Sequence, residues 1–471
     1  MTTEAAHESP RRCRAEASSI PELLGNKLPE TSTKDLITCV WGPGGPDREN
    51  LHRWSQGFAF STGEPTALIQ LHGGPCAVIA PVQAYLLKNA IYPEVHLVDA
   101  SWRTKNAQRL LTTAFMEIFS ILNAPNYALI LPEDPIRIPS KRDATAMDEV
   151  DLTHEENTDP HSEHGIHSNL RTLHFATLDD LRQYLEANPT VFCSSYGVLR
   201  FLYSVIISKS IEAVKLDLED PSEPLIDGAH GHGNQSLINL LLTGSAVANV
   251  WDNEKEFGPL RLKGIRFRPA VGFLSLLENM RYVEVGFYYK CPQYPIWILG
   301  SETHLSILFT LIPSLVTSEA EEAAAVRVFR EYDQHGSGFI NVDNLGDVLG
   351  LLNLFKEDDY VNSLKQKLDK EHLGIILRSD FLAEFFPSTG KFYNGQPFDV
   401  YHYNGLARSE SPIRYHHGRA KICELDFDLE IINLGDTDDT IDSDSAIVRC
   451  LRTKYPRVEI TWDDNKIPSI N

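Results

Sequence analysis

A Gly-Gly-Pro turn at 73–75 that runs straight into a helical pattern constrains this chain more than any other feature. The glycines and the proline predict a tight turn, and the residues after Cys76 carry apolar side chains at helical spacing. We therefore expect Cys76 to lie at the start of a helix. Pro81, early in this run, removes a hydrogen bond and predicts either a kink or a helix that starts slightly later.

The position of Cys76 has chemical consequences. A helix N-terminus carries roughly half a positive elementary charge and unpaired N–H groups. Both stabilise a thiolate, and the N–H groups also stabilise the oxyanion of a tetrahedral intermediate. The competing interpretation is that Cys76 is a small buried hydrophobic residue, which is the usual fate of a free cysteine. The local sequence does not match the papain-type cysteine signature.

A nucleophilic cysteine needs a base and an oxyanion donor. His304 is the best candidate base, because a strand pattern ends at a polar turn and a second strand begins with this histidine. His230, His232 and His402 are the rivals, and a hydrogen-bonded structural role for His304 is the alternative. Gln70, six positions before the cysteine, is the candidate oxyanion donor, although an exposed glutamine is the commoner case.

The bulk composition excludes several classes of function. The formal net charge is −22, from 43 basic and 65 acidic residues, so we expect neither nucleic acid nor a membrane as a partner. The seven cysteines contain no CxxC pair, so we expect no disulfide framework, no metal site and no cofactor. No secretory signal and no apolar run of membrane-spanning length is present. Reduced thiols in the cytoplasm or nucleus fit best.

Helical and strand patterns alternate along the chain, which predicts an α+β fold. We expect helices at 107–122, 198–207 and 236–242, and strands at 127–131, 294–299, 305–311, 398–403 and 457–462.

Composition suggests breaks in this pattern. Residues 1–34 are polar and predict a disordered tail. An acidic stretch at about 140–168 predicts a disordered, solvated insert. Its interleaved histidines, among them His167, leave a metal-binding tract as the alternative. Residues 318–390 are helical and carry Gly-containing loops, and strand-like sequence returns at 391–471.

Long blocks of the chain resemble the MINDY family of deubiquitinases, in particular the members with an EF-hand-like insert. The blocks read GGPCAVIAPVQAYLL at 73–87, SEPLID at 222–227, GHGNQSLINLLLTGSAVANVWD at 231–252, VGFLSL at 271–276, PIWILGSETHLS at 295–306, VYHYNGL at 400–406 and CLRTKYP at 450–456. The resemblance implies a papain-like cysteine peptidase fold. It also implies hydrolysis of isopeptide bonds in polyubiquitin, with a preference for lysine-48-linked chains.

The resemblance also implies roles for three residues. The family nucleophile falls on Cys76, the base on His304 and the oxyanion glutamine on Gln70. The group that orients His304 stays open, with Glu302, Asn404, Asp252, a backbone carbonyl or a water as candidates.

The implied organisation is a tail at 1–34, a peptidase domain at 35–317 with the acidic insert, an EF-hand-like insert at 318–390 and the C-terminal part of the peptidase domain at 391–471. We expect a monomer that acts on polyubiquitin chains and ubiquitinated proteins. An inert ubiquitin-binding scaffold and a calcium-regulated adaptor are the alternatives.

The insert holds two degenerate calcium loops, at 333–344 and 369–380. Both keep the first aspartate and the turning glycine of an EF-hand loop. The first loop has Asn344 where a bidentate glutamate is expected and His335 at another ligand position. The second places Leu373 and Leu377 where oxygen ligands belong. We expect a structural unit that binds no calcium.

Overall fold

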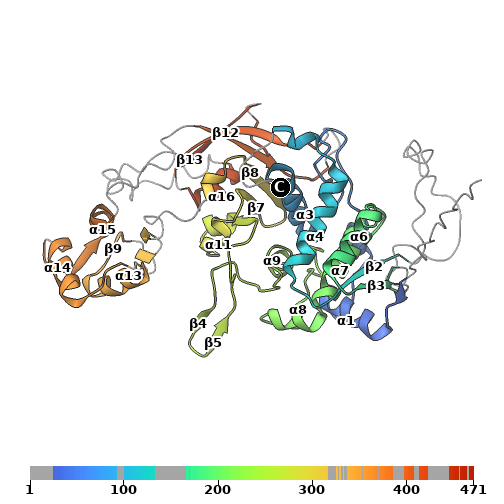
Figure 1. Ribbon diagram of the computed structural model, residues 1–471, viewed down its shortest axis with the longest axis horizontal. Coiled ribbons are helices and arrows are strands. Elements are labelled where there is room, and N and C mark those ends of the chain that lie inside the picture. The colour runs from blue at the N-terminus through green and yellow to red at the C-terminus, as the bar shows by residue number, and fades with distance from the viewer. Residues whose placement is uncertain are drawn as a thin grey trace, which may run out of the picture.

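The computed structural model describes residues 25–92, 100–132, 166–168, 170–316, 325–326, 328–329, 332–333, 337–352, 354–369, 371–385, 397–407, 413–422, 445–455, 457–463 and 466–471. These residues form an α+β protein (Figure 1). Among them, no helix has both the length and the apolar character needed to cross a bilayer.

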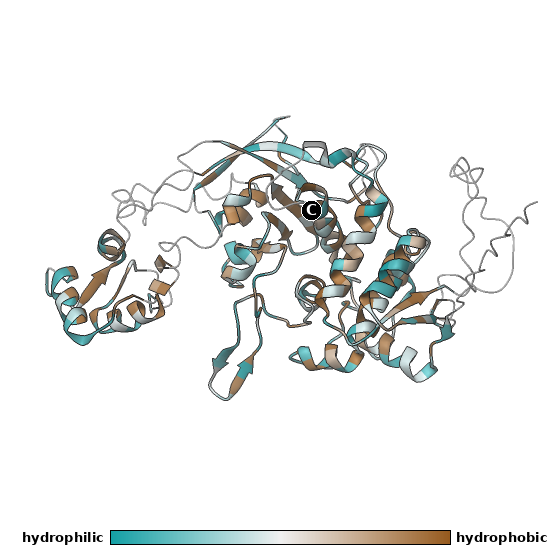
Figure 2. Ribbon diagram, viewed as in Figure 1, coloured by the Kyte–Doolittle hydropathy of each residue, from teal (hydrophilic) through white to brown (hydrophobic). Residues whose placement is uncertain are grey.

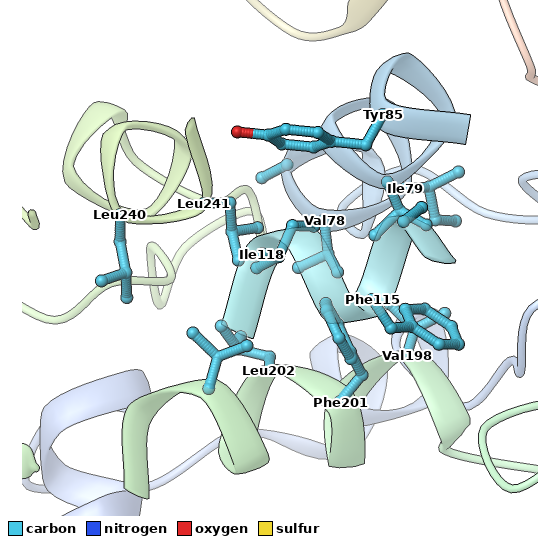
Figure 3. Close-up of a cluster of buried hydrophobic side chains, with 14 of the residues drawn as sticks. Val78, Ile79, Tyr85, Phe115, Ile118, Val198, Phe201, Leu202, Leu240 and Leu241 are labelled. Carbon is cyan, nitrogen blue, oxygen red and sulfur yellow. The ribbon is translucent and has the colours of Figure 1, made fainter. Parts of the chain in front are cut away.

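A buried helix, α3 (Cys76–Ile91), lies at the centre of the main hydrophobic core. Nearly all of its side chains are buried, so it packs against neighbours on every side. Those neighbours include α4 (Ala107–Ile121), α7 (Gly197–Lys209) and α9 (Gln235–Thr243). Figure 3 shows side chains of these four helices meeting in one cluster. The core therefore holds α3 rigidly, and with it Cys76.

The larger sheet has the strand order β13-β12-β11-β8-β7-β6. The strands are β6 (Gly272–Ser275), β7 (Ile296–Gly300), β8 (Leu305–Thr310), β11 (Phe398–Tyr403), β12 (His416–Ile422) and β13 (Val458–Trp462). β6 and β7 are parallel and the other neighbours antiparallel.

The two faces of this sheet belong to different cores, because side chains alternate along a strand. Ile296 and Ile298 of β7 join the main core beside α3, whereas Trp297 and Leu299 join a second cluster. That second cluster includes residues of α16 (Ala446–Arg452). Burial on both faces explains why β7 and most of β8 are apolar, with Ser306 and Thr310 as the buried polar residues of β8.

A smaller sheet has the order β1-β3-β2, built from β1 (Asn26–Lys27), β2 (Tyr127–Leu131) and β3 (Arg171–Phe175). The hairpin of β4 (Lys255–Phe257) and β5 (Leu260–Leu262) projects from the body (Figure 1). The remaining helices of this part are α1 (Glu30–Trp41), α2 (Arg48–Arg53), α6 (Leu178–Ala187), α8 (Ile211–Asp217), α10 (Leu276–Asn279) and α11 (Phe287–Lys290), with 3-10 turns at Ala100–Thr104 and Pro313–Val316.

Residues 325–385 have a hydrophobic cluster of their own. It joins α13 (Leu345–Leu351), α14 (Asp358–Leu368) and α15 (Arg378–Phe385), with β9 (Phe339–Asn341) paired to β10 (Ile375–Leu377) and a 3-10 turn at Val342–Asn344. Figure 2 shows brown, apolar segments turned toward the middle of this unit.

Its two loops have the same internal geometry. The Asp333 carboxylate accepts hydrogen bonds from the N–H groups of Ser337 and Gly338, both at 2.7 Å. The Asp369 carboxylate accepts from those of Leu373 and Gly374, at 2.8 and 2.9 Å.

The structure corrects the boundary of the N-terminal tail. We expected disorder to residue 34, but β1 pairs with β3 and α1 begins at Glu30. Leu28 is buried in the main core, and its N–H donates to Leu170 O at 2.8 Å. Leu28 and the two-residue strand β1 anchor this segment. A single apolar residue in a polar sequence is too short a pattern to predict such an element.

Most of the acidic insert predicted at about 140–168 lies outside the described residues, so its predicted disorder stays a prediction. His167, which we had grouped with its histidines, is buried, and its Nε2 lies 2.8 Å from the Tyr203 hydroxyl. Within the described part of the chain, no group of three or more His, Cys, Asp or Glu residues is arranged to hold a metal ion.

Candidate active site

Cys76 is the first residue of α3, and Pro75 occupies the N-cap. The helix therefore begins at the cysteine and runs through Pro81, so the expected later start is wrong. Pro81 is the sixth residue of the helix, so it leaves the carbonyl of Ala77 without its usual intrahelical donor. Gly74, at φ +119°, makes the turn that feeds the helix.

The Cys76 thiol is buried, and its Sγ lies 3.7 Å from the carbonyl oxygen of Gly74. Burial raises the pKa of the Cys76 thiol above its ordinary value. Hydrogen-bonding groups around Sγ oppose this rise: the main chain of Leu305, Ala77 and Gly74, and the side chain of Gln70. Burial therefore favours the neutral thiol, and the groups around Sγ oppose this preference.

Gln70 lies in an extended segment that forms a parallel bridge with Leu406, and its side chain reaches the Cys76 sulfur. Gln70 is 2 % exposed, so the alternative that it is a surface glutamine is wrong. Its main-chain N–H donates to Gly405 O, and its carbonyl accepts from Ala407 N, both at 2.8 Å. The side-chain Nε2 donates to His72 O at 2.7 Å and lies within hydrogen-bonding reach of Cys76. The backbone ladder thus fixes where the amide points.

His304 comes immediately before Leu305, whose main chain contacts the Cys76 sulfur. This brings the backbone that carries the predicted base close to the predicted nucleophile. His304 is buried and precedes β8, which starts at Leu305. Its Nε2 lies 2.9 Å from the carbonyl oxygen of Asn404. A carbonyl only accepts, so Nε2 carries the proton and Nδ1 is left as the basic nitrogen of the neutral ring.

The turn that carries His304 is closed by Ser301. The Ser301 N–H and Oγ both donate to His304 O at 3.0 Å, and the His304 N–H donates back to Ser301 Oγ at 3.0 Å. These bonds fix the backbone on which the imidazole stands.

Residues at 469–471 brace this turn from outside. Asn471 Oδ1 is a second acceptor for the Ser301 hydroxyl, which shares its one proton between Asn471 Oδ1 and His304 O. The Asn404 side-chain amide donates to Ser469 O at 2.8 Å. Ile470 between them is buried in the cluster beneath the sheet. Figure 1 marks the C-terminal end beside α3 and β8. The segment therefore contacts both residues that hold His304.

The other candidates have different surroundings. His402 is fully buried with Nε2 3.0 Å from Ser306 Oγ, and burial lowers its pKa to about 3, so it stays neutral. His230 pairs with Asp227 in an exposed turn, and its ring stacks on His232. His304 differs from these candidates because the main chain of the next residue, Leu305, contacts the Cys76 sulfur.

Two proposed partners of His304, Asp252 and Glu302, have other surroundings. The Asp252 carboxylate accepts hydrogen bonds from the N–H groups of Phe287 and Tyr288, at 2.7 and 2.9 Å, and so caps α11. Glu302 is exposed. The backbone carbonyl, which we had kept open, is the acceptor that the structure gives His304, and Asn404 supplies it. Sequence analysis missed Ser301 and the 469–471 segment, although the polar SETH turn hinted at the first.

A family model described as "Deubiquitinating enzyme MINDY-3/4, conserved domain" matches residues 47–338. The matched range contains Gln70, Cys76 and His304. The chain belongs to the MINDY-3/4 family of deubiquitinating enzymes. The chain is therefore a deubiquitinating cysteine peptidase.

Individual MINDY relatives match over nearly the whole chain. Ubiquitin carboxyl-terminal hydrolase MINDY-3 of Mus musculus is 41% identical over 456 residues, which cover 93% of this chain and 99% of that protein. The MINDY-3 homolog of Drosophila melanogaster is 38% identical over 479 residues, 93% of this chain and 83% of that protein. A probable MINDY-4 of Mus musculus is 31% identical over 255 residues, 53% of this chain and 32% of that protein. No solved structure matches the chain.

Proposed function

We propose that Cys76 is the nucleophile of this deubiquitinase, His304 its base and Gln70 its oxyanion donor. The observation that carries the proposal is the surroundings of Sγ. The sulfur lies at a helix N-terminus, within reach of the Gln70 amide and of the main chain that follows His304. A thiol nucleophile needs these groups together: a base, a donor for the oxyanion and a positive helix end.

The first step moves a proton. Nδ1 of His304 accepts the proton of the Cys76 thiol, while Nε2–H keeps its hydrogen bond to Asn404 O. The thiolate then attacks the carbonyl carbon of the C-terminal glycine of ubiquitin. The Gln70 amide and the Cys76 N–H hold the resulting oxyanion.

Collapse of the tetrahedral intermediate breaks the isopeptide bond. His304 returns its proton to the departing lysine amine, which leaves a thioester on Cys76. His304 then removes a proton from water, the water attacks the thioester, and ubiquitin leaves with a free carboxylate. The thiol form of Cys76 is restored, so the cycle balances without a metal or cofactor.

The finer features implied by the family resemblance belong to the same proposal. They are a papain-like arrangement of the peptidase part and a preference for lysine-48-linked chains. A buried central helix that begins at the nucleophile and packs against a sheet that carries the base supports the papain-like arrangement.

The linkage preference is tested with tetraubiquitin chains of each single linkage, at equal concentration, with wild type and Cys76→Ala. Wild type is expected to cleave lysine-48-linked chains fastest, and Cys76→Ala to cleave none while unfolding at the same temperature. Cleavage by folded Cys76→Ala overturns the nucleophile. Faster cleavage of another linkage overturns the preference alone.

We also propose that residues 318–390 form an EF-hand-like unit without calcium. The paired short strands β9 and β10 and the repeated aspartate–glycine loops support the first part. Asn344, Leu373 and Leu377 in place of oxygen ligands support the second. Titration calorimetry with calcium is expected to show no binding heat, and a micromolar dissociation constant would contradict the proposal.

A further inference from the structure

A cysteine and a lysine outside the active site are in direct contact. Lys454 Nζ lies 2.9 Å from Cys291 Sγ, although the two residues are 163 positions apart in the sequence. Cys291 is the C-cap of α11 and precedes β7, and Lys454 follows α16. Neither residue takes part in the mechanism proposed above.

The surroundings hold the lysine in place against the sulfur. Nζ lies over the rings of Tyr455 and Trp297, 4.7 and 5.7 Å from their centroids. Burial lowers the pKa of the Lys454 amine from its ordinary value, and Cys291 beside it opposes this shift. Burial therefore favours an uncharged amine, which is the nucleophilic form of lysine.

Cys291 is also one of the less buried cysteines among the described residues. Cys291 is only partly buried, whereas Cys39, Cys76 and Cys450 are buried. Cys193 is partly buried like Cys291, but its described side-chain contact is the amide of Gln108, 3.9 Å from Sγ. Cys193 is therefore an internal control: it belongs to the same burial class as Cys291, but its sulfur lies near the Gln108 amide and not near a lysine amine.

We propose that Cys291 and Lys454 form a peroxide-responsive modification site, in which Sγ and Nζ become joined by a sulfur–nitrogen bond. The Cys291 thiol passes its proton to the Lys454 amine beside it, and the sulfur attacks one oxygen of hydrogen peroxide. The O–O bond breaks, and the second oxygen takes that proton back from Lys454 and leaves as water. The product is a sulfenic acid, oxidised by two electrons relative to the thiol.

The Lys454 amine completes the modification. Its lone pair attacks Sγ, the S–O bond breaks, and the hydroxyl leaves as water with a proton from the amine. The product is a sulfenamide, and the pair has lost two hydrogens overall. Sulfenic acids are known to condense with a nearby nitrogen in this way. A thiol reductant reverses the step by attacking sulfur and releasing the amine.

The link would join the start of β7 to the segment between α16 and β13. Cross-links that close long loops constrain the unfolded chain and raise the free energy of unfolding. We therefore expect the oxidised protein to unfold at a higher temperature than the reduced protein, and the difference to vanish when thiol reductant is added.

The test treats full-length wild type, Lys454→Arg and Cys291→Ser with hydrogen peroxide, followed by dimedone and peptide mapping. Lys454→Arg keeps a long basic side chain that can lie over the two rings but has no nucleophilic amine. In wild type, the expected product is a cross-linked pair of peptides that contain Cys291 and Lys454 and are separated by thiol reductant. In Lys454→Arg, the expected product is dimedone-labelled Cys291. Cys193 provides the comparison within each sample and should form no lysine link.

Two results would overturn the proposal. One is dimedone-labelled or further oxidised Cys291 in wild type, at the level found in Lys454→Arg and without a cross-link. The other is Cys291 that reacts no faster than Cys193. Should Lys454→Arg fail to fold, wild type and Cys291→Ser still decide the matter, because the cross-linked peptide must appear in the first and be absent from the second.

Discussion

His304 Nε2 and the main-chain carbonyl of Asn404 are joined by a 2.9 Å hydrogen bond between residues 100 positions apart. The bond runs from the turn before β8 to the end of β11, two neighbouring strands. It selects the tautomer with a basic Nδ1. The orienting group of the proposed base is thus a backbone atom, and its place depends on the sheet.

Replacing Asn404 by alanine should leave this acceptor in place. The substitution removes the amide that donates to Ser469 O and the Oδ1 that accepts from Leu406 N at 3.1 Å. We expect kcat for polyubiquitin to fall by up to about thirtyfold, since two hydrogen bonds worth about 1 kcal/mol each are lost. His304→Ala should lower kcat by about 10²- to 10⁴-fold, as expected for loss of a general base. A loss in Asn404→Ala equal to that of His304→Ala would place the side chain itself in the mechanism.

Gln70→Ala should lower kcat by about 10²- to 10³-fold with little change in KM, because it removes an oxyanion donor. The fold should survive, since the main-chain bonds of Gln70 to Gly405 and Ala407 do not need its side chain. Steady-state kinetics and thermal unfolding of the same preparations check both parts. A large rise in KM at constant kcat would instead assign Gln70 to substrate binding.

The glycines before Cys76 differ in what they tolerate. Gly74 has φ +119°, and an added Cβ would lie 2.7 Å from Gly231 O and 3.0 Å from Trp54 Nε1. We expect Gly74→Ala to lower the free energy of unfolding by about 1–3 kcal/mol. Gly73→Ala is the matched control, because a Cβ there meets nothing within 4 Å, and it should stay within about 0.5 kcal/mol of wild type. Urea unfolding distinguishes them, and equal losses would contradict the described turn.

Buried His402 should make stability depend on pH. Its pKa is about 3 in the folded protein and 6.5 for the ordinary group, so between these values the unfolded chain binds one more proton. The free energy of unfolding therefore rises with pH through this window, and the contribution is complete above pH 6.5. The expected slope is about 1.4 kcal/mol per pH unit.

Urea unfolding at several pH values between about 5 and 6.5 keeps most carboxylates ionised, so histidines dominate the slope there. Burial also lowers the pKa of His72 and His232, so His402→Gln should reduce the slope without abolishing it. His174→Gln, at an exposed position of β3, is the control and should keep it. An unchanged slope in His402→Gln would mean that His402 does not titrate on unfolding.

Much of the fold could be predicted because its elements carry strong patterns. The strand at 127–131 and the helix that begins at 107 have long apolar runs with clear periods, and the structure confirms both. The segment at 26–28 escaped prediction, because its two paired residues are polar and only Leu28 is apolar. Three residues are too few to show the alternation of apolar and polar side chains by which a strand is predicted.

The residues of the site also differ in how strong a local sequence signal they carry. Cys76 and Gln70 stand in one continuous stretch of sequence, so turn and helix signals place them. The group that holds His304 is a backbone carbonyl, which leaves no residue-type signal. Ser301 and Asn471 are 170 positions apart, and nothing local in either segment indicates that they meet.

The most direct test of the central claim uses ubiquitin with a thiol-reactive electrophile at its C-terminus, incubated with wild type and Cys76→Ala and followed by intact mass and peptide mapping. We predict one ubiquitin-sized adduct on wild type, mapped to Cys76, and none on folded Cys76→Ala. An adduct on both proteins, or one mapped to another cysteine, would contradict the assignment of Cys76 as the nucleophile.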